Sequence, residues 1–157
     1  MAIMKDLISY NLRKFKFESE SVTHFTDTEL QSLLTSLSYF QELEVLELYL
    51  HFHQEKGIML FSKNSESRDL SSLLRNLASV ISGFYKMKEL TMSINGLKKY
   101  DIIASIELFK AMGNMTLLEK LSFSLATSKD LEYERKMIYR VMSERMPCLR
   151  DSTVLIR

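Results

Sequence analysis

Apolar and polar residues alternate in five short segments of the chain. Segments 43–50, 87–94, 118–125 and 149–156 each begin with an apolar residue and place further apolar residues three, five and seven positions later, with Ser152 as the one exception. Segment 12–19 follows the same rule except at Ser19. Alternation after the first two residues of a segment is typical of a half-buried strand. We therefore expect five strands, in segments that start near residues 12, 43, 87, 118 and 149.

The stretches between these segments carry apolar residues at the helical spacing i, i+3 and i+4. The four stripes are Leu30, Leu33, Leu34 and Leu37; Leu70, Leu73, Leu74, Leu77 and Ile81; Ile102, Ile103, Ile106, Phe109 and Met112; and Met137, Ile138, Val141 and Met142. Thr26 with Glu29 and Thr127 with Asp130 have the spacing of capping boxes. Because a helix carries the chain back after each strand, successive strands must run parallel.

The segments recur with a fixed period. Their starts are separated by 31, 44, 31 and 31 residues, so the second unit holds a 13-residue insertion, at about residues 51–64. Strands and helices of this kind bury their apolar sides only against neighbouring units. The prediction is one α/β domain over residues 1–157, a short solenoid of about five parallel strands with helices on the outer face.

One unit carries a resemblance to a known family. Residues 87–97, Met-Lys-Glu-Leu-Thr-Met-Ser-Ile-Asn-Gly-Leu, fit the leucine-rich repeat pattern L-x-x-L-x-L-x-x-N-x-L with Met in two Leu positions. With a full helix in each unit, the chain resembles the long, ribonuclease-inhibitor-like class, and its irregular repeats are similar to those of ciliate and other protist proteins. It departs from the pattern in its period of 31 and at the Asn position, which is His51 in one unit and Ala126 in another. The resemblance implies a protein-binding scaffold.

Composition narrows the function classes. Charged residues make up 26% of the chain and the net charge is +1, which argues against a nucleic-acid partner. No apolar run approaches the 18 residues of a membrane span. The one cysteine, Cys148, excludes an internal disulfide and favours an intracellular location, either cytoplasmic or in an organelle such as the mitochondrion.

Residue patterns that carry chemistry are weak in this sequence. His51 and His53 share one side of a strand, but no third ligand stands at zinc-site spacing. Cys148 has no evident activating base. The four glycines are too scattered for a phosphate-binding loop. We expect no cofactor, no metal, no small-molecule substrate and no catalytic residue.

Three surfaces are candidates for protein binding. In the predicted solenoid, the outward-facing strand residues form three rows on the concave face: Lys14, Val45, Glu89, Lys120 and Asp151; Lys16, Glu47, Thr91, Ser122 and Thr153; and Glu18, Tyr49, Ser93, Ser124 and Leu155. The insertion reads as a flap that either docks a partner or folds back, through Phe52, Ile58, Met59, Leu60 and Phe61. The last strand leaves an open edge at Thr153, Val154 and Leu155.

The favoured function is a non-catalytic protein-binding scaffold, a structural subunit of a large intracellular complex whose partners are other protein subunits. Neither end of the chain shows a polar capping repeat, so we expect either a partner at the ends or a longer parent protein, unless the short first helix and Arg157 cap the ends. The alternative is a recognition arm or adaptor, for example of a ubiquitin ligase. A more distant alternative is an enzyme whose site a partner completes.

Overall fold

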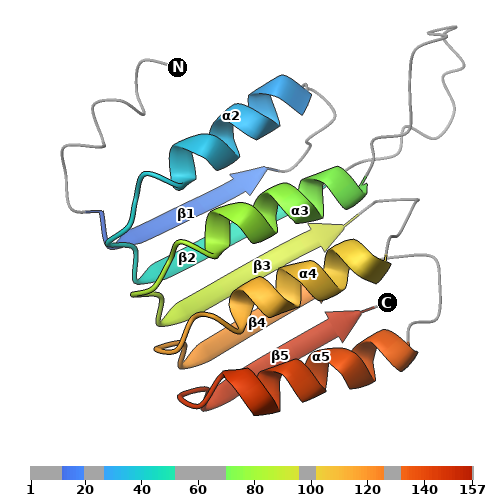
Figure 1. Ribbon diagram of the computed structural model, residues 1–157. Helices are drawn as coiled ribbons and strands as arrows, with labels where there is room; N and C mark the ends of the chain where they lie inside the picture. Colours follow the sequence, from blue (N-terminus) through green and yellow to red (C-terminus); the bar gives the residue numbers. More distant parts are fainter. Residues whose placement is uncertain (1–11, 20–26, 52–69, 96–101, 126–131, 157) are drawn as a thin grey trace, which may run out of the picture.

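The computed structural model describes residues 12–19, 27–51, 70–95, 102–125 and 132–156. These residues form an α/β structure in which strands and helices alternate along the chain (Figure 1). In order, the elements are β1 (Lys14–Ser19), α2 (Asp27–Leu37), β2 (Val45–His51), α3 (Leu70–Ile81), β3 (Glu89–Asn95), α4 (Ile102–Met112), β4 (Lys120–Leu125), α5 (Glu132–Arg145) and β5 (Asp151–Ile156). Each strand begins two residues after the start of its apolar segment.

The five strands form one sheet, and every pair of neighbours is parallel. The order in the sheet is the order in the sequence, β1-β2-β3-β4-β5. The helix after each strand returns the chain to the end of the sheet where the next strand starts, as a parallel pair requires. The predicted α/β class with a parallel sheet is therefore confirmed.

All four helices cover one face of the sheet (Figure 1). In β2, β3 and β4 the strand residues on that face are all apolar and no more than 2% exposed, whereas β1 and β5 each place one serine there, Ser19 and Ser152. Three register rows make up this layer: Leu46, Leu90 and Leu121; Leu48, Met92 and Phe123; and Leu50, Ile94 and Leu125. Burying a side chain of this size contributes roughly 1.5–3 kcal/mol, so these rows are a main source of stability.

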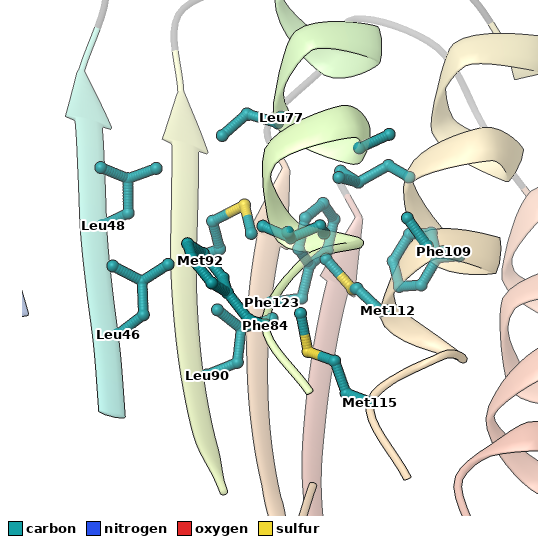
Figure 2. Packing of buried hydrophobic residues seen from close by; sticks show 14 of the residues in the cluster. Leu46, Leu48, Leu77, Phe84, Leu90, Met92, Phe109, Met112, Met115 and Phe123 are labelled. Atoms are coloured by element: carbon teal, nitrogen blue, oxygen red, sulfur yellow. The ribbon is translucent and has the colours of Figure 1, made fainter. Parts of the chain in front are cut away.

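The helices complete the core from the other side. Figure 2 shows Leu90 and Met92 pointing from β3 toward the helical layer, where Leu77 projects from α3. The ring of Phe109 in α4 meets that of Phe123 edge-on, with centroids 4.8 Å apart. The turns before β2, β3, β4 and β5 bury large side chains at equivalent positions, namely Phe40, Phe84, Met115 and Met146. The methionines at these positions act as core filler.

Among the stripe residues whose burial the structure describes, one that the helical pattern places in the core is exposed. Ile103 belongs to the predicted stripe of α4, but it is 58% exposed, whereas Ala104, Ser105 and Leu108 of the same helix are buried. The helix is apolar around most of its circumference, so periodicity could not decide which side faces the sheet. The proposed capping residues Thr26, Thr127 and Asp130 and the first ten residues lie outside the described part of the chain.

None of the helices in the described ranges has the length and apolar character that crossing a bilayer requires.

Gly113 occupies a tight position between two helices. A Cβ there would lie 3.0 Å from both Cβ and Cδ of Arg145 and 3.2 Å from the carbonyl oxygen of Lys110. Because the Arg145 Cβ is fixed to α5, we expect Gly113→Ala to push the ends of α4 and α5 apart and cost about 1–3 kcal/mol. Gly83→Ala is the matched control, since its Cβ would meet only the Val80 carbonyl at 3.5 Å. Urea unfolding of both variants tests this, and equal losses would contradict it.

Substitution by aspartate should destabilise the fold at one residue of β4 and have almost no effect at the next. Leu121 is 2% exposed in the core, whereas Ser122 is exposed on the other face. Leu121→Asp buries an uncompensated charge, which costs about 3–5 kcal/mol. The free energy of unfolding of a domain is only about 5–15 kcal/mol, so this loss is a large part of it. Ser122→Asp should melt close to the unsubstituted chain. Thermal unfolding by circular dichroism checks the pair, and similar melting of the two variants would show that the assigned sheet register is wrong.

Candidate functional site

The face of the sheet opposite the helices is the candidate site, and we call it the open sheet face (Figure 1). The strand register sets its side chains in three rows across all five strands. These rows are Lys14, Val45, Glu89, Lys120 and Asp151; Lys16, Glu47, Thr91, Ser122 and Thr153; and Glu18, Tyr49, Ser93, Ser124 and Leu155. Each of these fifteen residues is at least partly exposed. The pairing observed is the one that the 31-residue period predicts.

Ion pairs neutralise the charged part of this face. Lys14 Nζ lies 3.5 Å from Glu47 Oε1, and Lys120 Nζ lies 3.0 Å from Glu89 Oε1. On β1, Lys16 Nζ lies 3.1 Å from Glu18 Oε2 and 5.3 Å from the centre of the Tyr49 ring. Hydrogen bonding to Glu18 raises the pKa of Lys16, and hydrogen bonding to Glu89 raises that of Lys120. The face therefore has no strong field of either sign with which to select a charged partner.

A second charged row, which sequence reasoning missed, runs along the start of the strands. We call Arg13, Glu44, Lys88, Glu119 and Arg150 the strand-start row. Each carbonyl of its first four residues accepts two amides of the next unit; Arg13, for example, accepts those of Glu44 at 2.8 Å and Val45 at 2.9 Å. The side chains alternate in sign along the row. The second residue of every apolar segment carried this signal, visible only once the segments are aligned.

The strand-start row joins neighbouring units through its side chains as well. Glu44 lies 3.5 Å from Arg13 Nη1 through Oε1 and 2.8 Å from Lys88 Nζ through Oε2. Nearby, Glu42 pairs with Lys86 and accepts a hydrogen bond from the Tyr85 hydroxyl at 3.4 Å. The hydrogen bonds from Lys88 and Lys86 lower the pKa of Glu44 and of Glu42 respectively. These contacts join neighbouring units beside the strand starts.

The part of the open sheet face over β3, β4 and β5 is different in chemistry. Its last two rows carry no charge and consist mainly of small hydroxyl side chains, namely Thr91, Ser93, Ser122, Ser124 and Thr153. At the rim, Asn95 Nδ2 lies 3.1 Å from both His51 Nδ1 and Ser93 Oγ. Hydroxyl groups donate and accept hydrogen bonds and are short enough for a partner's main chain to approach closely.

The three residues of the predicted open edge differ in exposure. Leu155 is 42% exposed and Thr153 is exposed, whereas Val154 faces the helices and is partly buried against the core. The flap residues Phe52, Ile58, Met59, Leu60 and Phe61 lie outside the described residues. Within the described ranges, no group of three His, Cys, Asp or Glu side chains is arranged to hold a metal ion. Cys148 is exposed.

Comparison with protein-family models, with curated proteins and with solved structures found no match. The arrangement of the molecule therefore carries the functional argument. Its class is an α/β protein with a five-stranded parallel sheet, helices on one face and the open sheet face on the other.

Acid should weaken the contacts between units through Glu42 and Glu44. Each carboxyl has a lowered pKa in the folded chain, so near its ordinary value of 4.5 the unfolded chain binds more protons. The stability from these groups is present above that value and is lost as the pH falls below it. Between pH 6 and pH 3.5, we expect the melting temperature of Glu44→Gln to fall by less than that of the unsubstituted chain. Parallel pH curves would contradict the assignment.

Proposed function

We propose that this protein is a non-catalytic protein-binding scaffold that binds its partner through the open sheet face. One observation carries the proposal: fifteen outward side chains lie in register over five strands, and all of them are at least partly exposed. A sheet held by parallel pairing and a packed helical layer is rigid, so a partner meets a preorganised surface. Preorganisation lowers the conformational entropy that binding costs.

The size of the open sheet face limits how a partner can use it. Five strands about 4.8 Å apart, with six or seven residues each, give a surface of about 20 by 20 Å. That is about 400 Å², half of the roughly 800 Å² that each partner buries in a standard interface. A stable partner must therefore reach past the sheet onto its rim, where His51, Asn95 and the strand-start row lie.

The chemistry of the open sheet face indicates what the partner presents. Glu89 and Lys120 already neutralise each other, so a charged partner would gain little from either side chain. We call Thr91, Ser93, Ser122, Ser124 and Thr153 the hydroxyl region. This region favours a polar, uncharged segment that brings main-chain or amide groups close to Ser122 and Ser124. Such a contact depends on fit and hydrogen bonding more than on long-range attraction.

The leucine-rich repeat resemblance supports the same proposal. One helix per unit, parallel strands in sequence order and a free sheet face are what that class of repeat implies. Within this proposal the chain is a structural subunit of a large intracellular complex, and its single cysteine accords with a reducing compartment.

Site-specific photo-crosslinking tests the proposed surface. A photoreactive amino acid at Ser122, on the open sheet face, should form a discrete adduct with a partner in cells that naturally express the protein. The matched control places it at Ser143, an exposed residue of α5 on the helical side. Equal adducts from both positions, or an adduct from Ser143 alone, would refute the open sheet face as the binding surface.

A bulky charge in the hydroxyl region should abolish the same interaction. Ser122→Arg places a long cation where a partner approaches closely, and we expect at least a tenfold loss of affinity, which corresponds to about 1.4 kcal/mol. Ser143→Arg adds the same side chain on the opposite side and should leave affinity unchanged. Titration of the partner identified by crosslinking, with melting curves as a folding control, measures both. Unchanged binding by Ser122→Arg would contradict the proposal.

A further inference from the structure

The two outer strands of the sheet complement each other. Among the described residues, β1 pairs only with β2, and β5 pairs only with β4. We propose that β5 of one copy pairs with β1 of a second copy, so that the sheet continues from molecule to molecule in the same parallel register. This association uses the edges of the sheet and does not depend on the partner proposed for the open sheet face.

The core is unfinished at β5. In the register row that contains Leu90 and Leu121, which are 1% and 2% exposed, the β5 residue is Ser152, and it is exposed. In the next row, Val154 is only partly buried, beside the fully buried Phe123. With an exposed serine and a partly buried valine, the helix side of β5 is less covered than that of β4.

The β1 edge carries two aromatic side chains in the same register rows, of which Phe15 also stacks on Phe40 of its own chain. Phe15 and Phe17 occupy the same two register rows at the other end of the sheet, and both are only partly buried. If the second copy continues the register, its Phe15 lies beside Ser152 and its Phe17 beside Val154. Large rings would then cover the two positions at which the core is incomplete.

The outward-pointing backbone groups of β5 and β1 lie at positions that can face each other in this register. The Asp151 amide donates to the Glu119 carbonyl at 3.1 Å, so it points toward β4. Because backbone groups alternate in direction along a strand, Ser152 and Val154 direct their amides away from β4. On β1, the Arg13 carbonyl points toward β2, so Lys14 and Lys16 direct their backbone groups outward. These are the positions that neighbouring strands use within the sheet.

Charge on the open sheet face also favours the head-to-tail arrangement. The first row ends Glu89, Lys120, Asp151, and Lys14 of a second copy would extend this alternation of sign. Asp151 lies opposite Lys120 in the register of β4 and β5, so the two charges attract each other. The unfavourable contact is Arg150 against the second copy's Arg13, but both are exposed, and Arg13 also lies 3.5 Å from Glu44.

Cysteine pairs in the full chain test the register. In a Cys148→Ser background, Lys14→Cys with Asp151→Cys should form a ladder of disulfide-linked dimers, trimers and larger species under mild oxidation. A link within one chain is excluded, since β1 and β5 are four strand spacings apart, about 19 Å, whereas bridged Cα atoms lie within about 7 Å. The matched control is Lys14→Cys with Ser122→Cys, because β4 lies inside the sheet and no second β1 can reach it.

Proline at the outer edge supplies a second test. Ser152→Pro removes an amide that points away from β4, so it should abolish the crosslinked ladder while the chain still melts cooperatively. Sedimentation of the unsubstituted chain over a wide range of concentration should show mass rising above the 18.4 kDa monomer.

Three results would overturn the proposal. The first is an 18.4 kDa species at every concentration with no crosslinked ladder. The second is equal crosslinking of the test and control cysteine pairs, which would indicate random collision. The third is crosslinking of Thr153→Cys to itself without the Lys14–Asp151 link, which would show antiparallel pairing of two β5 strands.

Discussion

The parallel register of the five strands is the constraint on which the rest of this molecule depends. It is set where each strand starts, by a carbonyl that accepts two amides of the next unit, from Arg13 through Glu119. Because every unit repeats this contact, Leu46, Leu90 and Leu121 fall into one row beneath the helices. A shift of one residue would exchange this buried row with the polar row on the other face.

The same register decides the chemistry of the exposed face. It places Glu89 beside Lys120 and brings Ser122 between Thr91 and Thr153. Charged pairs gather toward the strand starts, and hydroxyl groups gather toward the strand ends over β3 to β5. Exposed ion pairs contribute little to stability, typically below about 1 kcal/mol each, so the side chains of the strand-start row add little to the backbone hydrogen bonds at the same positions. The buried apolar rows provide the stabilisation, and the polar rows remain exposed.

Much of this arrangement was predictable from the spacing of apolar residues. The strand alternation and the 31-residue period predicted five parallel strands and the three rows of the open sheet face. Alignment of the units would also have revealed the strand-start row, since Arg13, Glu44 and Lys88 hold equivalent positions. Ile103 was misplaced because α4 is apolar on several sides, and only packing against its neighbours selects the buried one.

The sequence by itself determined the order, direction and register of the strands, because side chains that alternate every two residues can bury only one set against the helices. Only the tertiary structure decided which side of α4 faces inward and which charges pair, such as Lys14 with Glu47 on the neighbouring strand. It also decided how completely the core closes at its two ends, where Phe15 and Val154 remain partly exposed. Such outcomes depend on how many neighbours surround a residue, and a linear pattern does not contain that number.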